Sequence, residues 1–309
     1  MTSIIFHNML PVIAACIAGI ILARTRRIDL PTLGTIVIYC IAPIVNFDAV
    51  LKIKADAAMF ALPLLTFTIC AVNSVLTSLW SKRLLHDQSA GLLVASSASS
   101  ANTLYFGLGI AMAVLPPDLV PVFLLCCIGP SLSETIFGYY FLARSRFDWR
   151  DATRRVVKLP VLYAVAFAIC CHALGLDRPD WLTPLAANSR GALIMLGSMI
   201  LGVGLGQEKN LHFNPGLVAA VLFSRHITYA LLTMGFLLLD LRTLHMIAPE
   251  HHHVFLLFIL MPIANNTLTF ASLLGLPTGP IGSTILASNI ASLGLTAGIY
   301  AFDPQWSLL

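Results

Sequence analysis

Charged residues are scarce in this chain of 309 residues: Asp, Glu, Lys and Arg make up 10% of it, whereas 58% is hydrophobic and the mean hydropathy is +0.88. This composition excludes an ordinary soluble domain, in which about a quarter of the residues are charged. Long polar stretches are also missing, since the longest connection between apolar runs spans only residues 143–158. No connection can hold a soluble catalytic domain, so any activity must reside within the membrane.

Familiar catalytic and metal-binding motifs are missing too. The chain has no Asp-rich pyrophosphate motif, no Gly-X-Ser-X-Gly elbow and no His-Glu-X-X-His zinc helix, which argues against an intramembrane enzyme. Its seven cysteines form neither a disulfide framework nor a zinc spacing, so we interpret them as packing residues and expect no cofactor. The triplet His251-His252-His253 resembles a metal tract. With only Glu250 beside it, we interpret it as a solvated loop and predict no metal site.

Apolar runs of about 20 residues, the length a helix needs to cross the hydrocarbon, fill nearly the whole chain instead. The first run lacks a preceding basic residue and a cleavage signal, so we interpret it as an uncleaved helix. We expect an all-α membrane protein with ten transmembrane helices, near residues 3–23, 32–51, 57–80, 89–114, 118–142, 158–175, 181–206, 214–240, 254–275 and 280–301.

The positive charges predict how these helices are oriented. Of the 18 Lys and Arg residues, twelve fall in odd-numbered connections and four in even-numbered ones. Because cytoplasmic loops are enriched in Lys and Arg, both termini are expected outside. The net charge of +4 follows from these loops and implies no nucleic-acid partner. We divide the chain into a five-helix half (1–142), a basic cytoplasmic linker (143–157) and a second half (158–309), which enters from the opposite side and forms an inverted repeat.

A repeated pentapeptide marks the middle of each half. The pattern Asn-Thr-Leu-X-Phe occurs from Asn102 to Phe106 and again from Asn266 to Phe270, each time in the fourth apolar run of its half. Polar side chains at this depth, next to Gly or Pro, indicate interrupted helices, whose freed backbone groups must face protein or a water-filled cavity. Paired interruptions of this kind are typical of the substrate site of a secondary transporter.

The two interruptions have different residues. Residues 96–103 are a run of Ser, Ala, Asn and Thr, which is compatible either with close helix packing or with a binding site. In the second half, Pro262 removes a helical hydrogen bond. We predict helix breaks at Pro262 and at Gly107.

If both helices break and cross, their half-helix ends form a cradle for an anion. The side-chain amides of Asn102, Asn265 and Asn266 can donate to a carboxylate, and the hydroxyls of Thr103 and Thr267 can do the same or coordinate a cation. The residues leave these two uses open.

Ionisable and amide groups at bilayer depth need a partner or a role. Burial of Glu134 favours its protonated form, so it is a candidate carrier of a coupling proton, or else a structural partner of a basic residue. Arg190 can snorkel, pair with Glu134 or bind a substrate carboxylate. Asn46 is a candidate substrate-facing group on the neighbouring domain.

Four other polar residues are given no substrate role. Arg225 and His226 are interpreted as structural, although a histidine there can titrate near neutral pH. Asp48 and Asp240 lie near the ends of predicted helices, where water is expected to reach them.

Several of these segments together resemble the auxin efflux carrier family, which contains plant auxin carriers and bacterial relatives, some of which carry malonate. The resemblance rests on Ile41 to Phe47, Asn102 to Gly107, Leu193 to Gly202, and Met261-Pro262 leading to Asn266. It implies ten helices with helices four and nine broken and crossing, as in bile-acid sodium symporters and sodium/proton antiporters. It also admits a homodimer, and the short central loop favours a bacterial-type member of the inner membrane.

The function expected from these features is secondary transport of a small organic anion, such as a mono- or dicarboxylate, driven by protons or by membrane potential. A core of helices three to five and eight to ten would move against a scaffold of helices one, two, six and seven. Two alternatives stay open: a sodium-coupled symporter of the same fold, and a membrane sensor that uses a transporter fold. The expected partners are the organic anion, a coupling proton or sodium ion, and membrane lipid.

Overall fold

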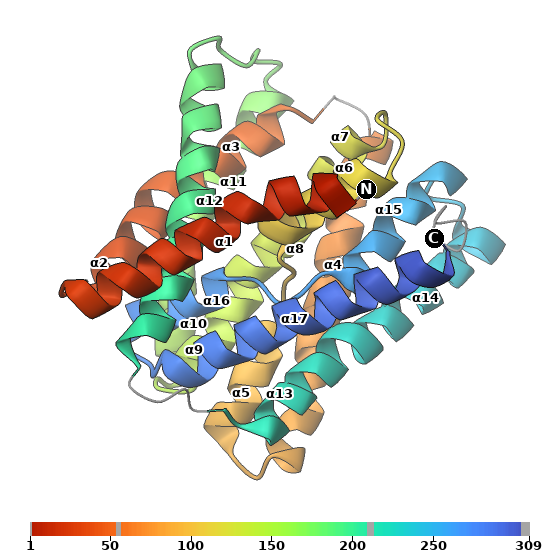
Figure 1. The fold of residues 1–309 in the computed structure, drawn as a ribbon. Coiled ribbons are helices and arrows are strands. Elements are labelled where there is room, and N and C mark those ends of the chain that lie inside the picture. Colours follow the sequence, from red (N-terminus) through yellow and green to blue (C-terminus); the bar gives the residue numbers. More distant parts are fainter. Residues whose placement is uncertain (1, 54–56, 209–212, 304–309) are drawn as a thin grey trace.

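The computed structural model describes residues 2–53, 57–208 and 213–303, which are helical throughout apart from short connections and contain no strand (Figure 1). The all-α prediction is confirmed for this part of the chain. Seven spans are counted in this part of the chain if the bent pair Trp149–Val157 and Pro160–Ala173 is added, as one span, to six longer stretches. The described residues contain six helical stretches long and apolar enough to cross a membrane, namely Leu30–Leu51, Met59–Leu84, Val120–Arg144, Leu182–Gln207, Pro215–Leu244 and Gly279–Phe302.

Most of these stretches consist of consecutive helices. The first half contains α1 (Thr2–Thr25), α2 (Leu30–Thr35), η1 (Ile36–Ile41), α3 (Ala42–Leu51), α4 (Ala57–Leu84), α5 (Gln88–Ser97), η2 (Thr103–Gly107), α6 (Leu108–Val114), α7 (Val120–Cys126), α8 (Ile128–Ser133), η3 (Glu134–Gly138) and α9 (Tyr139–Arg144). The second contains α10 (Trp149–Val157), α11 (Pro160–Ala173), α12 (Leu182–Gln207), α13 (Pro215–Leu222), η4 (Phe223–Thr228), α14 (Tyr229–Leu239), η5 (Asp240–Leu244), η6 (Pro249–His251), α15 (His252–Leu257), η7 (Phe258–Leu260), α16 (Asn266–Leu273) and α17 (Gly279–Phe302).

Small residues let α1 and α12 approach closely, and Figure 1 shows the two helices crossing. A Cβ atom at Gly202 would lie 2.0 Å from the Cys16 carbonyl oxygen, and one at Gly19 would lie 2.3 Å from the Met199 carbonyl oxygen. Close backbone approach of this kind is how helices associate where lipid removes the hydrophobic driving force. Glycine is therefore required at both contact points.

The connections between helices meet at two ends of the bundle. At one end the Arg146 guanidinium donates to the Leu274 carbonyl (2.8 Å), and the Gln207 side chain donates to the Ile28 carbonyl (2.7 Å). At another, the His172 ring contacts the Ile53 carbonyl. Connections far apart in sequence are thus brought together in space. Of the lysines in the predicted connections, Lys54 and Lys209 lie outside the described residues.

Candidate functional site

The chain leaves helical conformation at two places that lie against each other. Residues 98–102 separate α5 from η2, and residues 261–265 separate η7 from α16. The Asn102 backbone N–H donates to the Pro262 carbonyl (2.8 Å), which joins the two breaks directly. The interrupted segments are therefore those in which the repeated pentapeptide occurs, and each copy begins at the end of a break.

Gly107 does not lie at a break, and that prediction is wrong. Its φ and ψ of −65° and −41° are helical, and the chain continues from η2 into α6 without interruption. A Cβ atom at Gly107 would lie 2.6 Å from the Met261 methyl carbon. The glycine thus serves close packing against the second break, whereas the first break precedes the pentapeptide.

Buried polar side chains bind the carbonyl groups that the breaks expose. The Arg225 guanidinium donates to the Met261 carbonyl (2.8 Å) and to the Phe258 carbonyl, four residues before Pro262. In the first half, the Asn73 side chain donates to the Ala98 carbonyl (3.0 Å). Pro262 has no N–H group and cannot donate to the Phe258 carbonyl, so the Arg225 side chain replaces the missing donor. Arg225 therefore has a structural contact, in agreement with its interpretation from the sequence.

A cavity of about 430 Å³ opens beside the breaks. Six of the predicted substrate and coupling residues line it: Asn46, Asn102, Thr103, Glu134, Arg190 and Asn266. Sequence reasoning did not assign three further polar lining residues, Lys52, Tyr105 and Ser131. Most of the remaining wall is apolar, so a few polar side chains are the groups that can orient a ligand in this cavity.

Asn265 and Thr267 lie behind this cavity and not on its wall. The Asn102 side-chain amide donates to the side-chain oxygen Oδ1 of Asn265 at a long 3.4 Å, so Asn265 supports a cavity residue. Both Asn265 and Thr267 are 1% exposed. Their side chains are thus separated from the ligand space to which the sequence assigned them.

Among the residues that the structure describes, Glu134 is the one carboxylate on the cavity wall. Its Oε2 accepts a hydrogen bond from the Asn266 amide (3.3 Å), while its Oε1 is buried without a hydrogen-bond partner. The Oδ1 atom of Asn266 is likewise buried and unpartnered, and the Ser100 hydroxyl interacts with the Glu134 carboxylate. Since buried polar groups are normally satisfied, these oxygens indicate a place where a ligand or ion completes the contacts.

Asn46 approaches the same region from α3. Its amide donates to the Ala42 carbonyl (2.9 Å), and its carbonyl oxygen accepts from the Ser131 hydroxyl of α8 (3.2 Å). The cavity wall is therefore formed jointly by the second apolar stretch and by the segments that carry the breaks.

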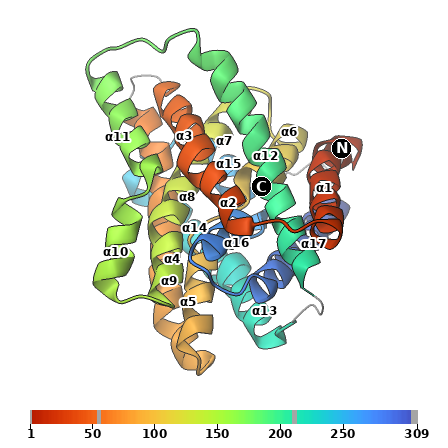
Figure 2. The ribbon, with the colours of Figure 1, turned by 90° about the vertical axis from the view of Figure 1, so that its left-hand side faces the viewer.

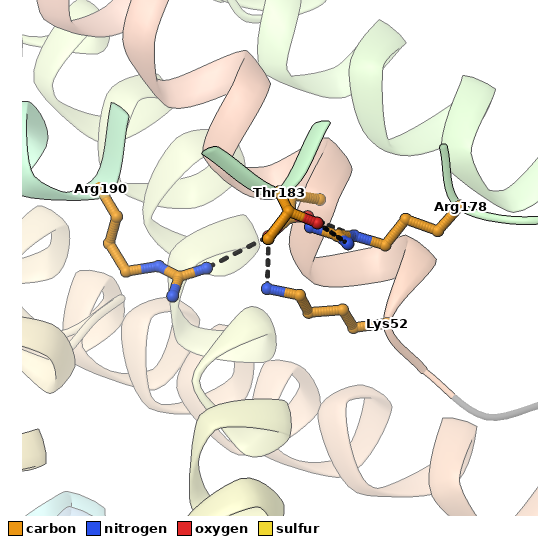
Figure 3. Close-up of polar contacts among 5 residues, drawn as sticks. Lys52, Arg178, Thr183 and Arg190 are labelled. Atoms are coloured by element: carbon orange, nitrogen blue, oxygen red, sulfur yellow. Dashed lines mark hydrogen bonds and ion pairs between the residues drawn. The ribbon is translucent and has the colours of Figure 1, made fainter. Parts of the chain in front are cut away.

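Asp48 is fully buried and surrounded by cations, contrary to the expectation that water reaches it. Its carboxylate lies 2.8 Å from Lys52 Nζ, 2.6 Å from Arg178 Nη2 and 3.2 Å from Arg190 Nη2. Figure 3 shows Lys52, Arg178 and Arg190 converging from separate segments. One carboxylate balances one of the three charges, so the cluster carries an excess of two positive charges, and Lys52 and Arg190 present them to the cavity.

Arg190 therefore pairs with Asp48, and no contact with Glu134 is found among the described residues. The side chain of Arg190 remains about a third exposed at 33%, and that of Lys52 is 47% exposed. Both retain donors for a ligand, because Lys52 has three ammonium hydrogens of which Asp48 needs one, and Arg190 contacts Asp48 through only one of its guanidinium nitrogens.

Two further interpretations need correction. Asp240 is buried and accepts from the Met246 backbone N–H (2.8 Å), and the His252 ring lies 3.0 Å from its carboxylate. His252 is thus packed against Asp240 and is not part of a solvated loop. No group of three His, Cys, Asp or Glu side chains that could hold a metal occurs in the part of the chain that the structure describes.

Comparison with known proteins gives no identification: no protein-family model matches the chain, and no curated protein matches it.

Proposed function

We propose that this chain is a secondary carrier of a small organic anion, a mono- or dicarboxylate. The observation that carries the proposal is that Asn102 and Asn266, at the ends of the two breaks, line the same cavity as Arg190 and Lys52. A carboxylate can leave water only where amide donors and positive charge replace its hydration, and charge-assisted hydrogen bonds are the stronger ones. An otherwise apolar wall then favours a small organic body over a hydrated inorganic anion.

The proposed architecture is ten transmembrane segments in two inverted halves, with both termini outside a bacterial inner membrane. Six membrane-length stretches, the helices α1 and α11 and the two interrupted segments would supply the ten. The breaks support this division, because each occupies the fourth segment of its half and they pair with each other. Contacts between connections support it as well. Arg146 and Leu274 join two connections at one end of the bundle, and His172 and Ile53 join two connections at the other end.

Transport would proceed by movement of a core against a scaffold. Asn102, Asn266 and Glu134 would travel with the core, while Asn46, on α3, and Arg190, on α12, would stay with the scaffold. A cavity lined by both parts is what such a cycle needs, since substrate must be released from one set of contacts when the parts separate.

Coupling would depend on Glu134. With one carboxylate oxygen bonded to Asn266 and the other unpartnered, it can take up a proton when the substrate anion binds nearby. A proton carried with the anion lowers the net charge that crosses the membrane, and the membrane potential acts on any charge that remains.

The sodium-coupled alternative is favoured by one observation. Glu134 Oε1 and Asn266 Oδ1 are both unpartnered acceptors, and the Ser100 hydroxyl oxygen lies beside Glu134. One proton satisfies only one of them, whereas an alkali cation can be coordinated by several oxygens at once, as at other interrupted helices.

Uptake of radiolabelled malonate and other small carboxylates into proteoliposomes tests the proposal. We expect saturable uptake by the native chain, and the imposed gradient that stimulates it, of protons or of sodium, identifies the coupling ion. Removal of both amides in Asn102→Ala/Asn266→Ala should lower uptake roughly ten-fold or more, because each hydrogen bond to a charged group contributes about 1.5–3 kcal/mol.

Asn289→Ala is the matched control, because Asn289 lies on α17 and is not part of the cavity wall. Its uptake should equal that of the native chain. The proposal fails if the folded native protein moves no carboxylate under any gradient, or if the double variant transports as well as the control.

A further inference from the structure

A second recess, of about 260 Å³, is lined by entirely different residues from the transport cavity. Its wall consists of Tyr39, Tyr139, Asp151, Arg154, Arg155 and Lys158. Three cations therefore face one carboxylate. The ion pair of Arg154 with Asp151, at 3.6 Å, joins side chains that are 70% and 55% exposed, so it neutralises little of the positive charge.

The recess is formed because α10 packs with one face inward. Asp148 caps this helix by accepting from the Asp151 backbone N–H (2.8 Å). Ala152 and Val156 are buried against the protein, which turns Arg154 and Arg155 to the outside. The basic side of a short amphipathic helix is thus held in a fixed position.

Two aromatic contacts position Arg155 further. Its guanidinium lies 3.9 Å from the centre of the Phe147 ring and interacts with the Tyr139 hydroxyl. Tyr139 is itself buried and packs edge-on against Phe270, with 5.2 Å between the ring centres. An arginine supported in this way keeps its planar fork available for an anion with little loss of entropy.

Exposed aromatic side chains occur on α10 and on the helix that follows it. Trp149 on α10 is 59% exposed, and on the following helix Tyr163 and Phe167 are 60% and 63% exposed on one face. Figure 2 shows α11 continuing directly from α10 along the edge of the bundle, beside α9 and α3. Aromatic residues next to a basic helix are typical of the level of lipid headgroups, with apolar helix surface beyond it for the acyl chains.

We propose that this recess binds the phosphate of an anionic phospholipid, with Arg154, Arg155 and Lys158 on the phosphate oxygens. Basic pockets between transmembrane helices bind anionic headgroups in this manner. A free phosphate ion would use the same cations, but it would gain nothing from the exposed apolar face of α11. The recess shares no residue with the transport cavity, so this site is independent of the proposed function.

The test is native mass spectrometry of the purified full chain in neutral detergent, titrated with phosphatidylglycerol, phosphatidylcholine or inorganic phosphate. We expect phosphatidylglycerol to bind in preference to both others. In Arg154→Gln/Arg155→Gln/Lys158→Gln, its affinity should fall about a hundred-fold, since each cation that contacts the phosphate in the recess should contribute roughly five-fold, or about 1 kcal/mol.

The matched control is Arg24→Gln/Arg26→Gln/Arg27→Gln, which removes the same charge from exposed residues in another connection. It should leave the affinity unchanged. If the first triple variant does not fold, the exposed Arg154→Gln alone should lower the affinity about five-fold. Equal binding of phosphatidylcholine or of free phosphate, or an equal loss in the control, would overturn the proposal.

Discussion

At the scale of single residues, Asp48 holds an unusual position because it is the shared partner of three cations. Removing its charge leaves Lys52, Arg178 and Arg190 to repel one another beside a buried amide. We expect Asp48→Asn to destabilise the protein by about 3 kcal/mol, as loss of one partner from a buried ion pair does. Thermal unfolding of the purified protein in detergent would report this as a lower Tm.

Asp118→Asn provides the control, because Asp118 is exposed and the substitution has the same chemistry. Its Tm should match that of the native chain. If both variants unfold at the same temperature, the three cations do not depend on Asp48.

A site residue could be predicted from the sequence only where neighbouring residues formed a recognisable motif. The repeated pentapeptide identified Asn102 and Asn266, and the structure places both on one cavity. Lys52 carried no such signal, since a lysine after an apolar run resembles any loop lysine. Its place on the cavity wall depends on Asp48, whose other partners lie 130 and 142 residues away in sequence.

At the scale of elements, the second break depends on Arg225. This side chain is fully buried and donates to two carbonyls that the break exposes, at Met261 and Phe258. Arg225→Met keeps the size of the side chain and removes both donors. We expect a loss of about 3 kcal/mol or more, because each hydrogen bond from a charged donor contributes about 1.5–3 kcal/mol. A lower Tm and faster amide hydrogen exchange around α16 would be the readouts.

Arg242→Met changes an exposed arginine in the same way and should alter neither readout. Arg225→Lys should recover only part of the stability, because one ammonium group lacks the rigid fork that reaches two carbonyls. Unchanged exchange at α16 in Arg225→Met would show that the break is maintained by other contacts.

Helical elements were predictable to different degrees. Pro262 indicated the second break, because a proline removes a donor whatever its surroundings. The first break could be located only to a Ser-rich segment, since no residue there is incompatible with a helix. Gly107 was assigned to a bend because glycine permits one, but in the fold it permits contact with Met261. That choice depends on a segment 154 residues further along the chain.

At the scale of the whole molecule, the proposed function requires two bodies that slide past each other. Asn46 on α3 and Ser131 on α8 contact each other across the proposed boundary, with 3.2 Å between the side-chain oxygens. By contrast, Phe47 and Phe167, whose ring centres are 5.6 Å apart, both belong to the proposed scaffold. A covalent link at the first pair should stop the motion, and one at the second should not.

We therefore expect mercury-mediated cross-linking of Asn46→Cys/Ser131→Cys to abolish most carboxylate uptake, with recovery after addition of dithiothreitol. Phe47→Cys/Phe167→Cys, treated identically, should retain its uptake, and the single variants report any effect at the seven native cysteines. Both links restrain the protein near the same helix, so general rigidity affects them alike. Undiminished uptake by a fully cross-linked first pair would show that α3 and α8 move together, and the boundary between core and scaffold would have to lie elsewhere.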